Sequence, residues 1–545
     1  MSFSDQADRT LALLAVTPGW QRLRSLRQDC DDETVAAIVG EAASFAERVL
    51  APLDAVGDRI GCRIENGRVV TPPGFAAGYR QFAAAGWIGI DVGECHGGSG
   101  LPLAVQAACA PLFERGCMSL MMAAGSARAA CHLLAAVADA ETADRWIPKL
   151  LAGDWAATIC ISEPDAGSDV GRIRTAAAWH DGIWRVTGQK VWISFGDHDL
   201  CGRIGHCLLA RTGEEAGTRG LSLFLVPDRH ADGRPNGVTP ERIEEKMGLH
   251  GSPTCALRFE AAEAILLGEA GRGLPQLFAM IEQMRLQTGG QGLGLASACC
   301  DIAEAYARER RQGGAPDAPA VPIAAHPDVR RQLRSMRHRT EILRAAHLEI
   351  ACAMDLARIA QDPPDRAAAR DFAGTLLPLI KTFGAEAGFD IASAGIQVLG
   401  GAGYTKDWPL ERHLRDARVM SIYEGTTGMQ AIDLLARRLW RDGGMGLEIC
   451  LERAAADIAL GGGALARSGM EAVEEFRALL AHMQALKATP EAGLERADSF
   501  LRAFWCLVSI WMLRRLGSVG LGEDELRQSV DRLRAELALF GRLCR

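Results

Sequence analysis

A run of small and polar residues, ISEPDAGSD at 161–169, could bind a flat or anionic ligand. Ser162 and Ser168 offer hydroxyl groups, and Gly167 allows the backbone N–H groups to approach a bound ring or diphosphate closely. The same residues could instead form an ordinary Pro-Gly turn between two strands, since turns of this composition are common. The segment alone does not decide between a binding loop and a turn.

An aromatic residue and a hydroxyl group lie two positions apart in a second segment, VWIS at 191–194. Alternate residues of a strand share one face, so Trp192 and Ser194 are expected to project together. An indole can cover a flat cofactor ring while the hydroxyl group hydrogen-bonds its edge. The alternative is a core tryptophan beside a solvated serine.

Two further segments could contact phosphate groups. Arg310 and Gln312 lie in YARERRQG, which on its own could be a solvated basic helix end. Gln397, Gly400 and Gly401 lie in QVLGGAGY, which could equally be a helix C-terminus with glycine caps.

Glu424, in the segment IYEGT, is the candidate catalytic base. A carboxylate is normally too weak to take a proton from carbon. Burial in a dry pocket raises its pKa, and hydrogen bonds to a substrate oxygen stabilise the developing negative charge. Without other motifs, the segment could be a simple loop that starts a helix at Thr426.

Together and in this order, these segments resemble the acyl-CoA dehydrogenase family over about residues 35–440. The resemblance implies that Glu424 takes the α-proton of an acyl-CoA, FAD takes the β-hydride, and the electrons pass to electron-transfer flavoprotein. The trans-2-enoyl-CoA is the implied product. The implied cofactor-binding residues are Ile161, Ser162, Gly167, Ser168, Trp192, Ser194, Arg310, Gln312, Gln397, Gly400, Gly401 and Thr426. The implied substrate contacts are Ser168, Glu282, Arg285 and Gly425.

The resemblance also assigns finer roles. Arg310 would meet the diphosphate of an FAD held mainly by a neighbouring subunit. Glu282 and Arg285 would lie near CoA, although a pair three residues apart on a helix can also be an ordinary surface ion pair. Some relatives carry the base at the position of Met284, so its absence here favours Glu424.

Two other departures from the family pattern bear on the loops. Asp165 stands where members often have glycine, which implies a small change in the loop and not in the chemistry. Gly313 stands where many members have an aromatic residue, so some contact on the adenine side is expected to be weaker or different. The methionines of CMSLMMAAGS at 117–126 could shorten the acyl pocket or simply fill the core.

Further segments narrow the resemblance to one branch: FGDHD, KMGLHGSP, HPDVRR and RDGG. That branch contains 3-(methylthio)propanoyl-CoA dehydrogenases and broad-range relatives with a C-terminal helical extension. It implies a short to medium acyl chain. It also implies a homodimer, because such an extension fills the space that a second dimer occupies in tetramers. The exact acyl group, the electron acceptor and the pathway stay open.

The elements that must position these residues follow an α, then β, then α order. Short apolar and β-branched runs punctuated by glycine, aspartate and proline fill the middle, and long amphipathic stretches follow. The sequence therefore predicts an α+β fold with an antiparallel β-barrel in its middle domain. The predicted domains are N-terminal helical (1–154), middle β (155–265), C-terminal helical bundle (266–440) and helical extension (441–545).

Composition bounds the class of protein. A chain of 545 residues with 48% hydrophobic and 23% charged residues is typical of a soluble protein of several domains. The 16 cysteines are scattered without a Cys-x-x-Cys pair, so no metal site or disulfide framework is predicted. No signal-peptide pattern begins the chain, and the apolar stretch Phe504–Leu513 is too short to span a membrane. A cytoplasmic protein that binds neither membrane nor nucleic acid is expected.

The sequence also bears on three alternative functions. An acyl-CoA oxidase on the same scaffold stays open, because fold does not fix function and oxygen access is not legible in a sequence. A DNA-associated flavoprotein of the same fold is disfavoured, since residues 441–545 carry 14 basic and 15 acidic residues. A non-catalytic binder is disfavoured by the presence of Glu424.

Overall fold

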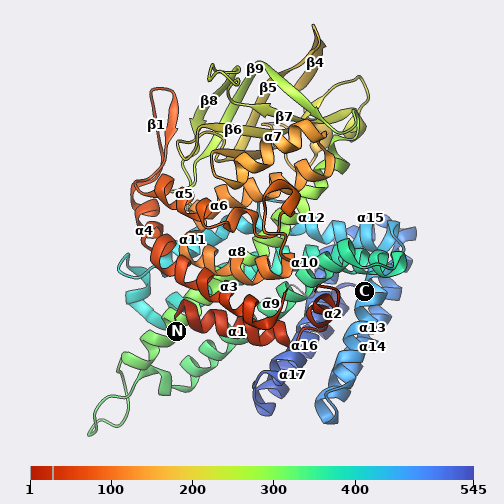
Figure 1. Cartoon of the computed structure of the whole chain (residues 1–545). Coiled ribbons are helices and arrows are strands. Elements are labelled where there is room, and N and C mark those ends of the chain that lie inside the picture. Colours follow the sequence, from red (N-terminus) through yellow and green to blue (C-terminus); the bar gives the residue numbers. More distant parts are fainter. Residues whose placement is uncertain (1, 28–29) are drawn as a thin grey trace. The chain divides into compact units, whose positions relative to one another are not determined.

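The computed structural model describes residues 2–27 and 30–545, which form two compact units (Figure 1). The β-containing unit comprises Phe45–Leu101 and Gly116–Met284, and the helical unit comprises Met1–Ser44, Pro102–Arg115 and Arg285–Arg545. Two of the crossings between units fall inside long helices, α6 (Leu103–Val137) and α8 (Gly273–Glu309). The order of helices, strands and helices confirms the predicted fold class.

The β-containing unit begins with helices and a hairpin. Its elements before the main sheet are α4 (Ala51–Ile60), β1 (Arg63–Glu65), β2 (Arg68–Val70), α5 (Phe75–Ala84), the second part of α6, and α7 (Ala140–Leu151). The β1–β2 hairpin was missed by the sequence analysis, which predicted mainly helices there. Its turn residues Asn66 and Gly67 both have positive φ, the conformation that a tight hairpin turn requires. The signal was the Asn-Gly pair.

Seven strands form the main sheet of this unit, drawn in yellow and light green in Figure 1. They are β3 (Trp155–Cys160), β4 (Ala176–His180), β5 (Ile183–Ser194), β6 (Arg203–Arg211), β7 (Leu221–Pro227), β8 (Val238–Ile243) and β9 (Thr254–Leu267). The order is β3-β6-β4-β5-β9-β7, β8 pairs with β9, and β6 also pairs with β7. The ring of pairings closes the sheet around a core that includes Val186, Leu208, Phe224 and Leu257.

The pairing is not antiparallel throughout, which corrects the prediction for this domain. β3 and β4 both pair with β6 in the parallel sense. A parallel pair needs a long crossover connection, and the chain between β3 and β6 is long enough to include β4 and β5. The remaining pairings are antiparallel.

The helical unit is built around long helices. Its elements up to residue 441 are α1 (Phe3–Ala15), α2 (Pro18–Leu26), α3 (Asp32–Phe45), the first part of α6, most of α8, α9 (Pro327–Ile359), α10 (Pro363–Leu399), α11 (Leu410–Arg418), α12 (Thr427–Ile432) and a π-helical stretch (Asp433–Arg441). α8 and α10 approach closely through glycine: a Cβ atom built on Gly292 would lie 1.8 Å from the carbonyl oxygen of Gly384. Any larger residue at position 292 would push the two helices apart.

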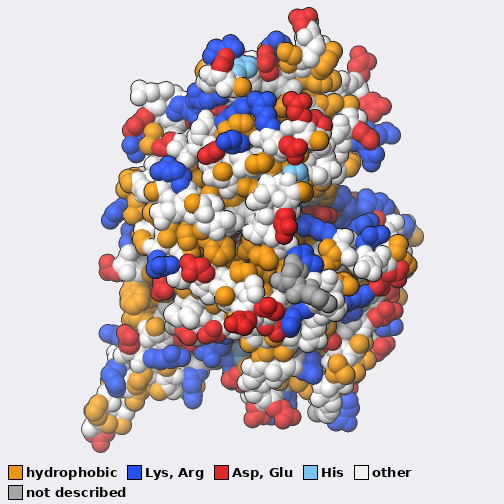
Figure 2. Space-filling view, in the orientation of Figure 1, with side chains coloured by type: hydrophobic (Ala, Val, Ile, Leu, Met, Phe, Trp, Pro, Cys, Tyr) orange, Lys and Arg blue, Asp and Glu red, His pale blue; other side chains and the backbone are white. Residues whose placement is uncertain are grey.

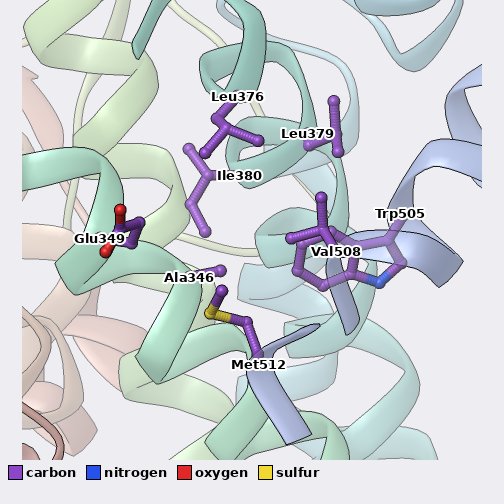
Figure 3. Close-up of a pocket in the computed structure, with 8 residues that line it drawn as sticks. All are labelled: Ala346, Glu349, Leu376, Leu379, Ile380, Trp505, Val508 and Met512. Carbon is purple, nitrogen blue, oxygen red and sulfur yellow. The ribbon is translucent and has the colours of Figure 1, made fainter. Parts of the chain in front are cut away.

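The C-terminal extension also belongs to the helical unit. It contains α13 (Met445–Ala459), α14 (Gly463–Ala485), α15 (Pro490–Glu495), α16 (Ala497–Ser518) and α17 (Glu523–Leu543), coloured blue in Figure 1. α16 packs on α9 and α10, and the Trp505 ring stacks on Phe383 with a centroid distance of 4.7 Å. The small recess between these helices is lined by apolar side chains and Glu349 (Figure 3). The extension is therefore a packed part of the bundle.

Helix α6 is long and apolar enough to cross a membrane, judged by length and composition alone. It is a longer apolar segment than Phe504–Leu513, the stretch considered from the sequence. Of its most apolar window, 72% is buried inside the structure, as in the core helix of a soluble protein. Basic and acidic side chains intermingle over the face shown in Figure 2. All 16 cysteines are free thiols, as expected.

Candidate active site

The loop that carries Glu424 has an unusual backbone. Glu424 has φ of 53° and Gly425 has φ of 89°, so two successive residues adopt left-handed conformations between a 3₁₀ turn (Val419–Ser421) and α12. Such a conformation costs a non-glycine residue about 1–3 kcal/mol and persists only where its surroundings enforce it. Thr426 caps α12, because its side chain accepts a hydrogen bond from the backbone N–H of Met429 at 3.3 Å.

Side chains from two other helices and α12 itself hold this loop. The Lys381 ammonium group on α10 donates to the carbonyl oxygen of Gly425 at 2.5 Å. The Gln430 amide of α12 donates to the carbonyl oxygens of Glu424 at 3.0 Å and Gly425 at 3.4 Å. The Tyr423 hydroxyl group donates to Oε1 of Gln291 on α8. The backbone on both sides of the Glu424 side chain is therefore fixed.

Burial and charge act on Glu424 in opposite directions. Burial raises the pKa of its carboxyl group, while the positive charges of Arg285 and Lys381 lower it, and the net shift is upward. Arg285 also forms an ion pair with Asp433 at 2.8 Å and is largely buried, unlike an ordinary surface pair. A carboxylate with a raised pKa beside fixed positive charge is a plausible carbon base.

A buried polar cluster lies behind Tyr423. Glu114 on α6 accepts a hydrogen bond from the Gln287 amide at 3.0 Å, and its burial raises its pKa to about 8. Burial raises the pKa of Tyr423 well above 10. At neutral pH both Glu114 and Tyr423 are therefore uncharged, so they add no negative charge near Glu424.

In the β-containing unit, the loop after β3 is pinned by a buried ion pair. The Lys190 ammonium group lies 2.8 Å from Oε1 of Glu163 and donates to the carbonyl oxygen of Ile161 at 2.9 Å. The Glu163 carboxylate also accepts hydrogen bonds from the backbone N–H groups of Arg174 and Thr175 at 2.7 and 3.0 Å. Burial raises the pKa of Glu163, but Lys190 and these donors lower it more.

The same loop leaves its tip open. Gly167 and Ser168 are exposed, and a Cβ atom at Gly167 would meet no atom within 4 Å. Ile161 and Ser162 are partly buried where the loop leaves β3, and the Ser162 carbonyl oxygen accepts a hydrogen bond from the Val191 N–H at 2.9 Å. The loop thus presents accessible N–H and hydroxyl groups on a rigid base.

Trp192 is more unusual than its position in a strand suggested. It has φ of 63°, and the β5–β9 register shifts between Lys190 and Ile193, so it occupies a β-bulge. Its side chain is 61% exposed, whereas the flanking Val191 and Ile193 are buried. Ser194 is partly exposed. Trp192 is therefore not the core tryptophan of the alternative interpretation, and its indole face is accessible.

A third group of predicted residues lies elsewhere on the helical unit. Arg310, Gln312, Gln397, Gly400 and Gly401 are all exposed. Arg310 follows the end of α8, which places it roughly 37 Å along that helix from Arg285 at 1.5 Å per residue. Arg285 thus acts on Glu424, which Gly425 and Thr426 directly follow, whereas Arg310 lies apart from Arg285 along α8. Glu282, Ile161, Ser162, Gly167, Ser168, Trp192 and Ser194 belong to the β-containing unit.

The structure explains why glycine, and not the aromatic residue frequent in the family, occupies position 313. It has φ of 70°, and a Cβ atom there would lie 2.9 Å from Cε1 of His326. The His326 imidazole is hydrogen-bonded to the carbonyl oxygen of Gln312 at 2.8 Å. A larger residue would displace this contact, so the loop after α8 has adapted to glycine.

Sequence reasoning missed Lys381, Gln430, Glu163, Lys190 and Glu114. Lys381 lies in the apolar run LPLIKTF and is fully buried, and a charge inside such a run was a usable signal. Lys190 and Glu163 lie inside or beside motifs whose small and aromatic residues indicate ligand contacts, and this obscures their own structural role. No group of His, Cys, Asp and Glu suited to a metal ion occurs in the described ranges 2–27 and 30–545.

Comparisons with known proteins show the family of this chain. Family descriptions for the acyl-CoA dehydrogenase N-terminal, middle and C-terminal domains match residues 32–154, 158–262 and 271–440. The chain is 37% identical over 517 residues to 3-methylmercaptopropionyl-CoA dehydrogenase of Ruegeria pomeroyi, covering 91% of this chain and 87% of that one. It is 35% identical to the broad-specificity linear acyl-CoA dehydrogenase FadE5 of Mycobacterium tuberculosis, covering 77% and 72%.

Solved structures share the fold along nearly the whole chain. An acyl-CoA dehydrogenase from Bacillus anthracis complexed with FAD has a TM-score of 0.79 at 20% identity, covering 95% of this chain and 89% of that one. Caenorhabditis elegans ACDH-11 in complex with C11-CoA has a TM-score of 0.77 at 21% identity, covering 98% and 91%. The chain belongs to the acyl-CoA dehydrogenase family, which consists of oxidoreductases that bind FAD.

Proposed function

We propose that this protein is an FAD-dependent acyl-CoA dehydrogenase that converts an acyl-CoA thioester to the trans-2-enoyl-CoA. The observation that carries the proposal is Glu424: a carboxyl group of raised pKa on a left-handed backbone, beside two buried cations. Perturbed carboxyl groups on strained backbone are typical of catalytic sites. Glu424 abstracts the α-proton, and bound FAD supplies the acceptor for the β-hydride.

The residues present fit FAD. The exposed indole of Trp192 offers a flat face, and the open tip at Gly167 and Ser168 offers backbone donors without steric obstruction. Ile161, Ser162, Ser194 and Thr426 complete the flavin-side contacts in this proposal. Arg310, Gln312, Gln397, Gly400 and Gly401 contact the FAD of a second subunit, which is consistent with their exposure and their distance from Glu424.

The proposed substrate contacts are Ser168 and Glu282 of the β-containing unit and Arg285 and Gly425 of the helical unit. Ser168, Glu282 and Arg285 contact the CoA moiety, and the backbone at Glu424 and Gly425 lies against the thioester. Because Lys381 and Gln430 occupy the carbonyl oxygens of this loop, its N–H groups are oriented away from them and can donate to the thioester oxygen.

The acyl group is short to medium in length, and 3-(methylthio)propanoyl-CoA is the first candidate. The support is the 37% identity over almost the whole chain to the Ruegeria pomeroyi enzyme. Electron-transfer flavoprotein is the proposed electron acceptor, and a cytoplasmic homodimer is the proposed form. The homodimer is proposed from the presence of the C-terminal extension, which packs against α9 and α10.

Anaerobic titration of the purified holoprotein tests this function. Butanoyl-, octanoyl- and 3-(methylthio)propanoyl-CoA are added in turn while flavin absorbance is followed. Bleaching by one thioester without added acceptor supports the dehydrogenase and ranks the acyl groups. Reoxidation by electron-transfer flavoprotein rather than by oxygen then separates a dehydrogenase from an oxidase. A flavin that no thioester bleaches contradicts the proposal.

A further inference from the structure

A lysine in the middle of a helix bundle requires an explanation. Lys381 lies on α10 with no exposed surface, and lysine is almost never fully buried unless its charge is used. Its ammonium group donates to a backbone carbonyl oxygen, that of Gly425, at 2.5 Å. Burial of this charge destabilises the folded protein, because burial lowers the pKa of Lys381 to about 8 while Glu424 opposes that shift.

Lys381 contacts the loop that carries Glu424 through the backbone of Gly425. Gly425 directly follows Glu424, and both residues are left-handed. The Gln430 amide adds a second donor to the Gly425 carbonyl oxygen at 3.4 Å, so this oxygen is saturated on the side away from the Glu424 side chain. Rotation of the peptide between Gly425 and Thr426 would break both contacts.

The charges around Lys381 come from every helix packed against the loop. Arg285 of α8 and Glu386 of α10 act on Lys381 together with Glu424. Arg285 is largely neutralised by Asp433, which also pairs with Arg437 at 3.2 Å. Glu386 is paired with Arg502 of the extension at 3.0 Å. Lys381 has no ion-pair partner of its own in the described residues, and Glu424 is the charged group that acts on it most strongly.

We propose that Lys381 is a positioning residue that fixes the Gly425–Thr426 peptide next to Glu424 and keeps the Glu424 carboxyl group ionised and ready to take a proton. This inference rests on the proposed role of Glu424 as the base. Lys381 itself neither gives nor receives the substrate proton, which passes from the α-carbon to the Glu424 carboxylate. Its contribution is one hydrogen bond and one fixed positive charge.

The test uses the full-length holoprotein with Lys381→Met, which keeps the side-chain length and removes the charge. Infrared titration follows the Glu424 carboxyl band, identified by its loss in Glu424→Gln. The expected result is an upward shift of the Glu424 pKa by about one to three units. Lys381→Arg retains the charge and should leave that pKa near the wild-type value.

Flavin reduction provides the second readout. The pH at which reduction by the best acyl-CoA is half-maximal should rise in Lys381→Met by the same amount as the infrared pKa. Lys487→Met is the matched control, because Lys487 also donates to a backbone carbonyl oxygen, that of Trp440 at 2.6 Å, but in the extension. That control should leave both values unchanged.

Lower thermal stability of Lys381→Met with an unshifted Glu424 pKa would mean a purely structural role and overturn the inference. If Lys381→Met does not fold, Lys381→Arg decides: its permanent charge should abolish the loss of activity that deprotonation of Lys381 causes near pH 8, and an unchanged alkaline profile overturns the inference. The infrared titration needs no turnover. If no acyl-CoA reduces the wild-type flavin, the proposed function fails while the effect of Lys381 on Glu424 is still measured.

Discussion

The Lys190 ammonium group lies 2.8 Å from the Glu163 carboxylate, and both side chains are buried beneath the loop that follows β3. Glu163 stands inside the motif proposed to bind the flavin, between Ser162 and the open tip at Gly167. The loop that is proposed to contact the flavin is thus stabilised by this buried charge pair.

Lys190→Met should destabilise the protein by about 3–5 kcal/mol, because it leaves the Glu163 carboxylate buried without its partner. The double variant Lys190→Met with Glu163→Gln should recover part of this loss. Chemical denaturation of the apoprotein measures the free energies of unfolding. Equal stabilities of the single variant and the wild type would contradict the structural role given to this pair.

Glu424→Gln should make the folded protein more stable at neutral pH. Burial raises the pKa of Glu424 in the folded state, so the group favours folding when protonated, and this contribution is lost as the pH rises through the raised pKa. The difference in Tm between the wild type and Glu424→Gln should therefore be small below about pH 4.5 and grow at higher pH. The exposed Glu474→Gln serves as control and should show no such trend.

Trp192→Ala should weaken FAD binding roughly two- to tenfold, the loss expected when one aromatic contact is removed. Because the indole is 61% exposed in the protein alone, the Tm of the apoprotein should change little. Fluorescence titration of the apoprotein with FAD measures the affinity. Trp179→Ala is the matched control, since that tryptophan is 59% exposed on β4. Equal FAD affinities of the two variants would contradict the assignment of Trp192.

Arg515→Met should destabilise the bundle by about 3–5 kcal/mol, because Arg515 of α16 and Glu349 of α9 form a buried ion pair at 2.8 Å. The extension and the rest of the helical unit should then unfold together at a lower temperature. Calorimetry that instead resolves a separate, low-temperature transition of the extension would contradict the description of one packed bundle.

The sequence predicted the elements where local patterns agree with the tertiary structure. The long helices α8, α9 and α10 lie where the sequence predicts long amphipathic stretches after the β domain, and each begins at a glycine or proline. The β1–β2 hairpin was not predicted, because its strands are only three residues long. The parallel pairing of β3 with β6 was not predicted, because strand order depends on contacts between residues that are far apart in the chain.

The residues of the candidate site were also only partly predictable from the sequence. Glu424 and Trp192 belong to short motifs whose residue types indicate chemistry, so the sequence could identify them. Their left-handed backbones, and the helices that enforce them, could not be predicted from local spacing. Lys381 is 43 residues from Glu424, and only the packing of α10 against the loop makes it relevant.

The most direct test of the central claim compares the wild type with Glu424→Gln in rapid-mixing flavin reduction under anaerobic conditions, using the thioester that bleaches the wild type best. If Glu424 is the base, the variant should bind FAD and acyl-CoA normally and reduce its flavin at least about 100-fold more slowly, the lower bound for loss of a general base. Reduction at the wild-type rate would show that another residue takes the proton and would contradict the account.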